Sequence, residues 1–112
     1  MEFVIPIKTI SVTNAREFWR VRAKRAKIER DDAHRHTCGV LQFLKTPGKF
    51  CITLTRLAPR KLDSDNLAGA CKSIRDGIAD ALGMDDGDER LTWEYAQEKA
   101  KENGVRVRME AL

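Results

Sequence analysis

The sequence predicts an α+β domain in which helices pack on one face of an antiparallel or mixed sheet. Segments rich in β-branched and aromatic residues alternate with two longer segments of helical periodicity. In chain order they predict strand, helix, strand, strand, helix, strand and strand. This β-α-β-β-α-β-β order favours helices collected on one side of the sheet. We expect all 112 residues (1–112) to form a single domain with a modest core.

Composition restricts the class of protein. Hydrophobic residues make up 42% of the chain and charged residues 34%, so we expect no segment that spans a bilayer. The N-terminus lacks a charged region followed by a long apolar stretch, so we expect no secretory signal. Three cysteines at irregular spacing predict reduced thiols and a cytoplasmic location. The net charge of +4 favours an anionic partner.

The first strand is expected over residues 3–11, which are rich in β-branched side chains. Pro6 favours an edge position or a strand end. A turn then leads into a helix over residues 15–33. One stripe of this helix carries mostly small side chains and is expected to lie close to the sheet. Its members are Trp19, Ala23, Ala26 and Ala33.

The same helical segment is strongly basic. Between Arg16 and Arg30 there are seven bases and two acids. A solvated helix face explains this run, and so does a surface that contacts DNA phosphates independently of sequence. Both interpretations stay open at this point. The candidate DNA-contacting bases, here and beyond the following strands, are Arg16, Arg20, Lys24, Lys27, Arg60 and Lys61.

The next segment predicts a polar loop and then a β-hairpin. His34, His36 and Cys38 would suit zinc, but no second pair of ligands follows, which favours a polar loop. Residues 38–45 and 49–58 are both typical of strands and flank a Pro-Gly turn. We therefore expect these two strands to pair with each other.

A second helix is expected from Leu67 to Leu82, where apolar residues recur at the spacing of one buried face, and Gly83 is expected to end it. Gly69 and Gly77 each cost about 1 kcal/mol relative to alanine within a helix. We infer that they permit close packing of the backbone.

Two further strands complete the predicted sheet. Residues 91–96 alternate so that one face carries Trp93 and Tyr95. Residues 105–109 alternate again, with arginines on the outward face. The Asn-Gly pair between these segments predicts a hairpin turn, so we expect them to be neighbours in the sheet.

An acidic segment, residues 63–89, stands out in this basic chain, because it holds eight acids and two bases, Lys72 and Arg75. Like charges at this density repel unless a cation lies among them. Carboxylate oxygens suit Mg²⁺ or Mn²⁺, and two such ions can clamp the attacking and leaving oxygens of a phosphodiester. Lys72 would stabilise negative charge on the phosphoryl oxygens.

The spacing of these residues favours one site but leaves simpler interpretations open. On one continuous helix a single stripe would hold Asp65, Gly69, Lys72 and Asp76. Asp63 can approach Asp65 if the chain turns before the helix, whereas Asp86 needs tertiary or dimer contacts. Carboxylates at a helix start also serve as caps. The acids that follow the helix also suit a polar turn or part of a calcium loop.

These motifs resemble a known family. The stretch Asp63-Ser64-Asp65-Asn66-Leu67, followed by Lys72, Asp76 and the pair Asp85-Asp86, resembles the signature of the RusA family of Holliday junction resolvases, which are crossover junction endodeoxyribonucleases. The segments 14–19 and 92–97 resemble parts of phage-borne and prophage-borne members. The resemblance therefore extends over most of the chain.

The resemblance implies an Mg²⁺-dependent homodimer that binds four-way DNA junctions and cuts two strands symmetrically. Asp63, Asp65 and Asp86 would be the metal ligands, and together with Lys72 they would be the catalytic residues. Its setting would be the cytoplasm of a bacterial or phage-infected cell, with no membrane partner. One departure is that residues 68–70 resemble an insertion of about one helical turn before the lysine.

Two other classes of protein fit the same residues. The chain could be a non-catalytic basic DNA-binding protein whose acidic segment contacts a protein partner. It could also be a structural metal-binding protein, stabilised by Ca²⁺ or Mg²⁺ and without affinity for DNA.

Overall fold

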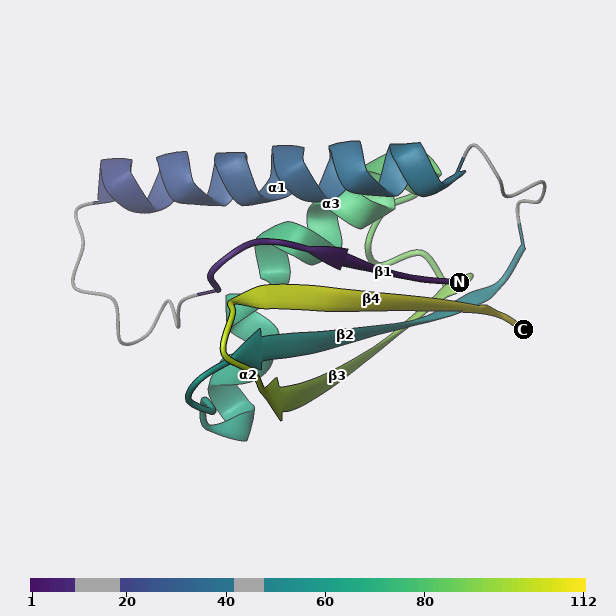
Figure 1. Ribbon diagram of the computed structural model, residues 1–112. Coiled ribbons are helices and arrows are strands. Elements are labelled where there is room, and N and C mark those ends of the chain that lie inside the picture. Colours follow the sequence, from purple (N-terminus) through teal and green to yellow (C-terminus); the bar gives the residue numbers. More distant parts are fainter. Residues whose placement is uncertain (10–18, 42–47) are drawn as a thin grey trace.

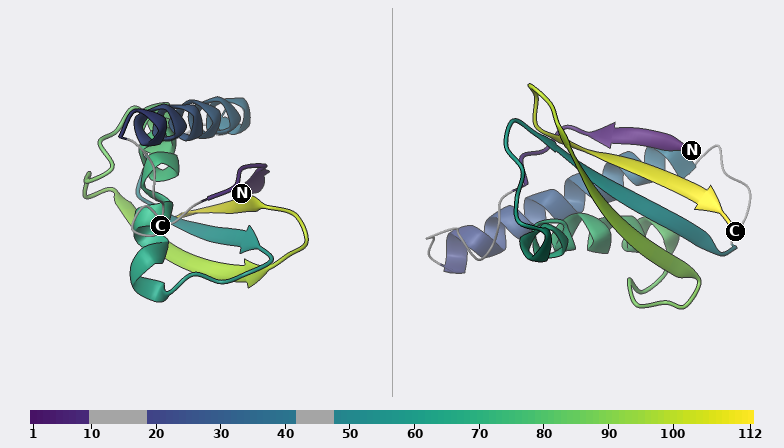
Figure 2. Two further views of the ribbon diagram at one scale, coloured as in Figure 1. Left: turned by 90° about the vertical axis from the view of Figure 1, so that its left-hand side faces the viewer. Right: turned by 90° about the horizontal axis from the view of Figure 1, so that it is seen from below.

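The computed structural model describes residues 1–9, 19–41 and 48–112. In these ranges the α+β class is confirmed, because a four-stranded mixed sheet carries its helices on one face (Figures 1 and 2). The elements in chain order are β1 (Glu2–Ile5), α1 (Trp19–Leu41), β2 (Phe50–Ala58), α2 (Ser64–Ala70), α3 (Lys72–Leu82), β3 (Leu91–Lys99) and β4 (Gly104–Ala111). No helix in the described ranges is both long and apolar enough to cross a membrane.

The strands lie in the order β1-β4-β2-β3, so β4 and β2 are the inner strands. β2 runs parallel to β3, with Leu54 opposite Tyr95, and antiparallel to β4, with Leu54 opposite Val107. β1 pairs with the outer side of β4. The edge position predicted from Pro6 is therefore confirmed. The strand covers Glu2–Ile5, residues 6–9 of the predicted strand do not belong to it, and residues 10 and 11 lie outside the described residues.

Both predicted hairpins are wrong. Residues 38–41 belong to α1, while 42–45 lie outside the described residues, and β2 takes its partners from the end of the chain. β3 and β4 are not neighbours either, because β2 lies between them. The reason is burial. Alternate residues of β4 are apolar and buried, and this strand lies inside the sheet, where β1 pairs with one of its edges and β2 with the other.

The described part of α1 begins at Trp19 and continues through the segment expected to be a polar loop, whereas residues 15–18 of the predicted helix lie outside the described residues. Two polar side chains bond to the helix's own carbonyl oxygens there, so the helix need not end. The Thr37 hydroxyl donates to the Ala33 carbonyl at 2.7 Å, and His36 Nδ1 lies 2.8 Å from the Asp32 carbonyl oxygen. Such bonds to the preceding turn satisfy polar groups within a helix.

The core lies between the sheet and the helices. β2 alternates strictly, so every second residue faces the helices and is buried. These residues are Phe50, Ile52, Leu54, Arg56 and Ala58. Val105 and Val107 from β4 and Ile74 and Ile78 from α3 are fully buried in the same cluster. One member of the β2 row, Arg56, is charged.

The predicted second helix is two helices. The chain bends at Cys71, which ends α2 and precedes the first residue of α3. Cys71 is fully buried, and this burial raises the pKa of its thiol to about 12. Gly83 ends α3 in the left-handed conformation, with φ of 71°, as predicted. Because of the bend, Asp65 and Lys72 do not share one continuous helical stripe.

α1 packs against α3 at their small residues. Gly77 of α3 lies against the backbone of Arg30 and the side chain of Ala33 in α1. The close approach predicted for Gly77 is therefore confirmed, whereas Gly69 borders open space. Trp19, expected on the buried stripe, is 72% exposed, because the first turns of α1 extend beyond the sheet (Figure 1).

Candidate functional site

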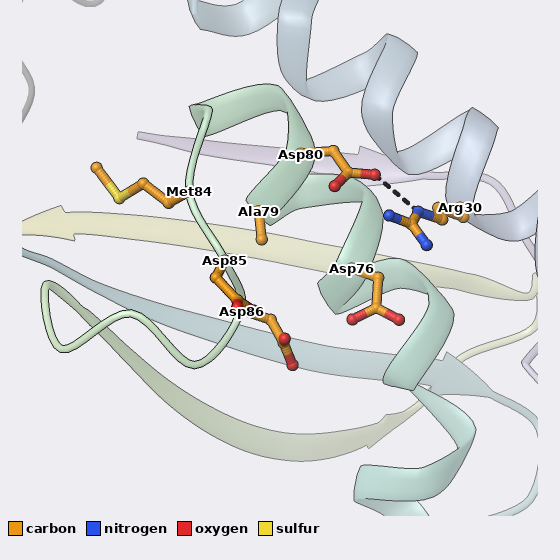
Figure 3. Close-up of a pocket in the computed structure, with 7 residues that line it drawn as sticks. All are labelled: Arg30, Asp76, Ala79, Asp80, Met84, Asp85 and Asp86. Carbon is orange, nitrogen blue, oxygen red and sulfur yellow. Dashed lines mark hydrogen bonds and ion pairs between the residues drawn. The ribbon is translucent and has the colours of Figure 1, made fainter.

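An acidic cavity of about 300 Å³ lies between α3, the loop that follows it and α1 (Figure 3). The residues that line it are Arg30, Asp76, Ala79, Asp80, Met84, Asp85 and Asp86. The Asp76 and Asp86 carboxylates point into the same space from the helix and from the loop, whereas Met84 points away (Figure 3). The loop thus folds back along the helix, as a shared site requires.

Lys72 connects these two carboxylates. Its Nζ donates to Asp76 Oδ1 at 2.8 Å and to Asp86 Oδ2 at 2.9 Å. The lysine begins α3, so Asp76 lies one turn further along the same helix face. Asp86 is brought to this face by the loop. A predicted catalytic lysine and a predicted metal ligand are therefore in direct contact.

A second cation and two aromatic residues hold Asp86 in place. Arg75 Nε lies 3.2 Å from Asp86 Oδ2, and Arg75 Nη2 donates to the Asp86 carbonyl at 3.0 Å. Trp93 Nε1 donates to the same carbonyl at 2.9 Å. The Arg75 guanidinium lies over the Trp93 ring, 4.9 Å from its centroid, and donates to the Tyr95 hydroxyl at 3.0 Å. These contacts fix the loop against β3.

Sequence reasoning placed Trp93 and Tyr95 on one face of a strand but did not assign Arg75 or these aromatic residues to the site. The signal was present in part. Arg75 follows Lys72 by three residues, a spacing that puts both on neighbouring parts of one helix face. The fold of the loop over β3 was the missing information.

The chain's own bases relieve much of the repulsion expected within the acidic segment. The expectation that a bound cation is needed to relieve it is therefore wrong. Asp86 contacts Lys72 and Arg75, and Asp80 Oδ2 lies 2.7 Å from Arg30 Nε in α1. Asp88 pairs with Arg90 at 2.8 Å. Hydrogen bonds from the partner bases hold the pKa of each of these three carboxyls below its ordinary value.

Removing the Lys72 charge is expected to raise the pKa of Asp86. The Lys72 hydrogen bond is the main cause of the lowered pKa, with the Arg75 charge adding to it. Because the folded pKa is lowered, the pairing stabilises the fold above the unfolded pKa of about 3.9, and this stabilisation is lost as pH falls through the folded value. In Lys72→Gln, an NMR titration of the Asp86 carboxyl in EDTA should show a higher midpoint. An unchanged midpoint would contradict the assigned cause.

The other two predicted metal ligands lie at the start of α2. Asp63 is the residue before the helix, with an extended backbone and an exposed side chain that makes no capping hydrogen bond. Its carboxylate is thus not committed to the helix end. Asp65 is in the first turn of α2, and its side chain lies outside the described part. Lys72, Asp76 and Asp86 are brought together, whereas no contact between Asp63 and Asp86 is seen.

The fit to a divalent cation can be judged from the donors. Carboxylate oxygens are the ligands that Mg²⁺ and Mn²⁺ prefer. Among the described side chains, no group of three or more histidines, cysteines or acids is spaced to hold a metal ion. Of the three predicted ligands, Asp65 has a side chain that lies outside the described part, whereas the side chains of Asp63 and Asp86 are described. Both are carboxylates, and neither is buried away from solvent.

The predicted DNA-contacting bases fall into two groups. Arg20, Lys24 and Lys27 are exposed and lie on one stripe of α1. Arg60 and Lys61 are exposed in the connection between β2 and α2. Arg16 lies outside the described residues. The two groups thus come from separate elements of the fold.

In comparisons with known proteins, no protein-family model and no curated protein matches this chain.

Proposed function

We propose that the protein is an Mg²⁺-dependent, structure-selective endonuclease that resolves four-way DNA junctions by symmetrical phosphodiester cleavage. The observation that carries the proposal is the contact between Lys72 and Asp86, which are 14 residues apart in the sequence and lie 2.9 Å apart at their charged atoms. The extra turn before Lys72 therefore does not remove it from a carboxylate of the proposed triad. The resemblance of the acidic motifs to the RusA family supports the same activity.

In this mechanism Asp63, Asp65 and Asp86 would hold Mg²⁺ or Mn²⁺. When bound, the ion would lower the pKa of a coordinated water and neutralise charge that develops on the phosphate. Lys72, held at the site by Asp76 and Asp86, would donate to a phosphoryl oxygen of the scissile group.

The exposed bases of α1 would position the DNA through its backbone phosphates, without reading its sequence. A homodimer would present two such sites to the two strands of a junction, which is the reason for expecting paired cuts. Branched DNA is therefore the proposed partner, together with a second copy of the chain.

A second candidate function is a non-catalytic DNA-binding protein whose acidic segment contacts a protein partner. The observation that favours it is the internal pairing of Asp80, Asp86 and Asp88 with bases of the same chain. Carboxylates that already have partners need no metal ion. This alternative predicts salt-sensitive DNA binding without divalent-dependent cleavage.

A synthetic four-way junction incubated with and without Mg²⁺ separates these functions. Native gels report binding, and denaturing gels report cuts in each labelled strand. The nuclease predicts paired cuts that require Mg²⁺, and it predicts that Asp65→Asn abolishes them while junction binding is kept. Binding with no cut in any strand would favour the second function. Neither binding nor cutting, combined with thermal stabilisation by Mg²⁺, would favour a structural metal-binding protein.

A further inference from the structure

Arg56 occupies a position in the sheet that is normally apolar. It belongs to the row of β2 residues that faces the helices, two residues after Leu54 and two before Ala58. Its side chain is deeply buried, and the residue is only 8% exposed. A charged group at such a position carries a desolvation cost that must be offset by its partners.

The partners of the Arg56 guanidinium are neutral. Nε donates to the Thr9 hydroxyl at 2.8 Å, Nη1 to the Arg60 carbonyl at 2.6 Å, and Nη2 to the Thr9 carbonyl at 3.5 Å. In the described ranges no carboxylate forms an ion pair with it. The buried positive charge is therefore held by oxygen dipoles and is not neutralised. Such an arrangement is unfavourable for stability alone and suits the binding of an anion.

Arg56 lines a cavity of about 270 Å³ at the end of β2. The lining residues are Lys8, Arg56, Ala58, Pro59, Arg60 and Asn103. Three bases thus come from three places: the segment after β1, the end of β2 and the connection to α2. None of the lining residues is acidic. This cavity is distinct from the acidic one, which Asp76 and Asp86 line.

The geometry leaves donors available for a ligand. A guanidinium has five N–H groups, and the three bonds to Thr9 and Arg60 leave one on each terminal nitrogen. Two N–H groups on one planar fork match two oxygens of a phosphate. Lys8 and Arg60 are exposed, so their charged ends are free to reach an anion at the mouth of the cavity.

We propose that Lys8, Arg56 and Arg60 form a phosphate-binding pocket whose ligand in the DNA complex is a phosphodiester of the backbone. The identity of that ligand rests on the proposed nuclease function. Arg60 precedes Asp63 by three residues, so their Cα atoms are at most about 11 Å apart. The pocket therefore lies close along the chain to a proposed metal ligand and would hold the strand near the cleavage site.

The pocket is tested first with inorganic phosphate, in EDTA, so that no metal site contributes. Isotope-labelled protein is titrated while the NMR shifts of the Lys8, Arg60 and Asn103 amides are followed. We expect saturable shifts, and at least about fivefold weaker affinity in Lys8→Gln and in Arg60→Gln. The matched control is Lys101→Gln, which removes one exposed base near the same end of the sheet without altering the cavity lining. Its affinity should stay within about twofold.

Both test substitutions are at exposed positions, so the experiment does not depend on a folded Arg56 variant. Shifts no larger than those given by sodium chloride at the same ionic strength would overturn the pocket. Equal loss of affinity in Lys8→Gln and Lys101→Gln would also overturn it, because the effect would then be general charge.

DNA binding tests the ligand separately. With a four-way junction, affinity is measured at several salt concentrations. The slope of log affinity against log salt should become shallower by about 1 in Lys8→Gln, the change expected for one lost phosphate contact, and should stay unchanged in Lys101→Gln. Phosphate binding without any junction cleavage would support the pocket and overturn the nuclease. Cleavage by wild type, with phosphate affinity and salt slope unchanged in Lys8→Gln and Arg60→Gln, would overturn the pocket and leave the nuclease standing.

Discussion

Gly77→Ala is expected to destabilise the protein by about 2–3 kcal/mol, because the added methyl group has no space between α1 and α3. A Cβ at this position would overlap the Arg30 carbonyl oxygen and lie 2.8 Å from the Ala33 Cβ. The gain in helix propensity, about 1 kcal/mol, is too small to offset the separation of two packed backbones. Thermal unfolding followed by circular dichroism should show a midpoint lower by about 10 °C.

Gly69→Ala is the matched control for this prediction. Gly69 also lies in a helix, but a Cβ there would meet nothing within 4 Å. The same chemical change should therefore stabilise the protein, by about 0.5–1 kcal/mol. Two variants that shift the midpoint in the same direction would contradict the assigned role of Gly77 as the contact point between the helices.

The fold class could be predicted from periodicity, but the strand pairing could not. Alternation within residues 49–58 and 105–109 identifies strands because it depends only on which side chains are buried. Which strand lies beside which depends on contacts between distant parts of the chain. The Asn-Gly pair before β4 favours a hairpin locally, yet pairing β4 with β2 and β1 covers both of its edges.

The helix ends show the same limit. Residues 34–38 are polar, and polarity alone predicted a loop. Bonds from Thr37 and His36 back to carbonyls of the same helix let α1 continue. The bend at Cys71 was also missed, because its apolar neighbours keep the spacing of one buried face across the break. Burial pattern therefore identified what faces the core, but not where each helix begins and ends.

The acidic segment shows why local charge counts mislead. Within residues 63–89, eight acids face two bases, which suggests strong repulsion. In the fold, Arg30 reaches Asp80 from α1, and both local bases converge on Asp86. These pairs are at least partly exposed, so each contributes little to stability, but they determine which carboxylates are available to a ligand. The contact of Lys72 with Asp86 is the part of the site that spacing alone could not establish.

For Arg56, in contrast to the acidic segment, the sequence alone contained a signal that indicates a site. Its position in the alternation of β2 placed a charge among Ile52, Leu54 and Ala58. A buried arginine in an otherwise apolar row is uncommon and indicates either an ion pair or a ligand. Because the partners of Arg56 in the fold are neutral, an ion pair does not explain its burial, and we propose that a bound anion does.

Asp86→Asn is expected to lower the rate of junction cleavage in Mg²⁺ by at least about a hundredfold, because a metal ligand contributes more than the supporting residues around it. Binding should persist in EDTA, since loss of one negative charge near phosphate favours DNA. The loop should keep its place, because Trp93 Nε1 and Arg75 Nη2 donate to the Asp86 main-chain carbonyl, which the substitution leaves unchanged. Single-turnover cleavage and gel-shift affinity of the same preparation measure the two effects.

Asp88→Asn controls for loss of a carboxylate from the same loop. Asp88 pairs with Arg90 and does not line the acidic cavity, so its variant should cleave within about twofold of wild type. If both variants lose cleavage together, the effect is one of loop structure or total charge, and Asp86 is not a specific ligand. If Asp86→Asn cleaves fully, the Asp86 carboxylate is not an essential metal ligand, and its ion pairs with Lys72 and Arg75 serve only the fold. A loss confined to Asp86→Asn, with binding kept, would assign Asp86 a specific role in cleavage, either as a metal ligand or through the position of Lys72.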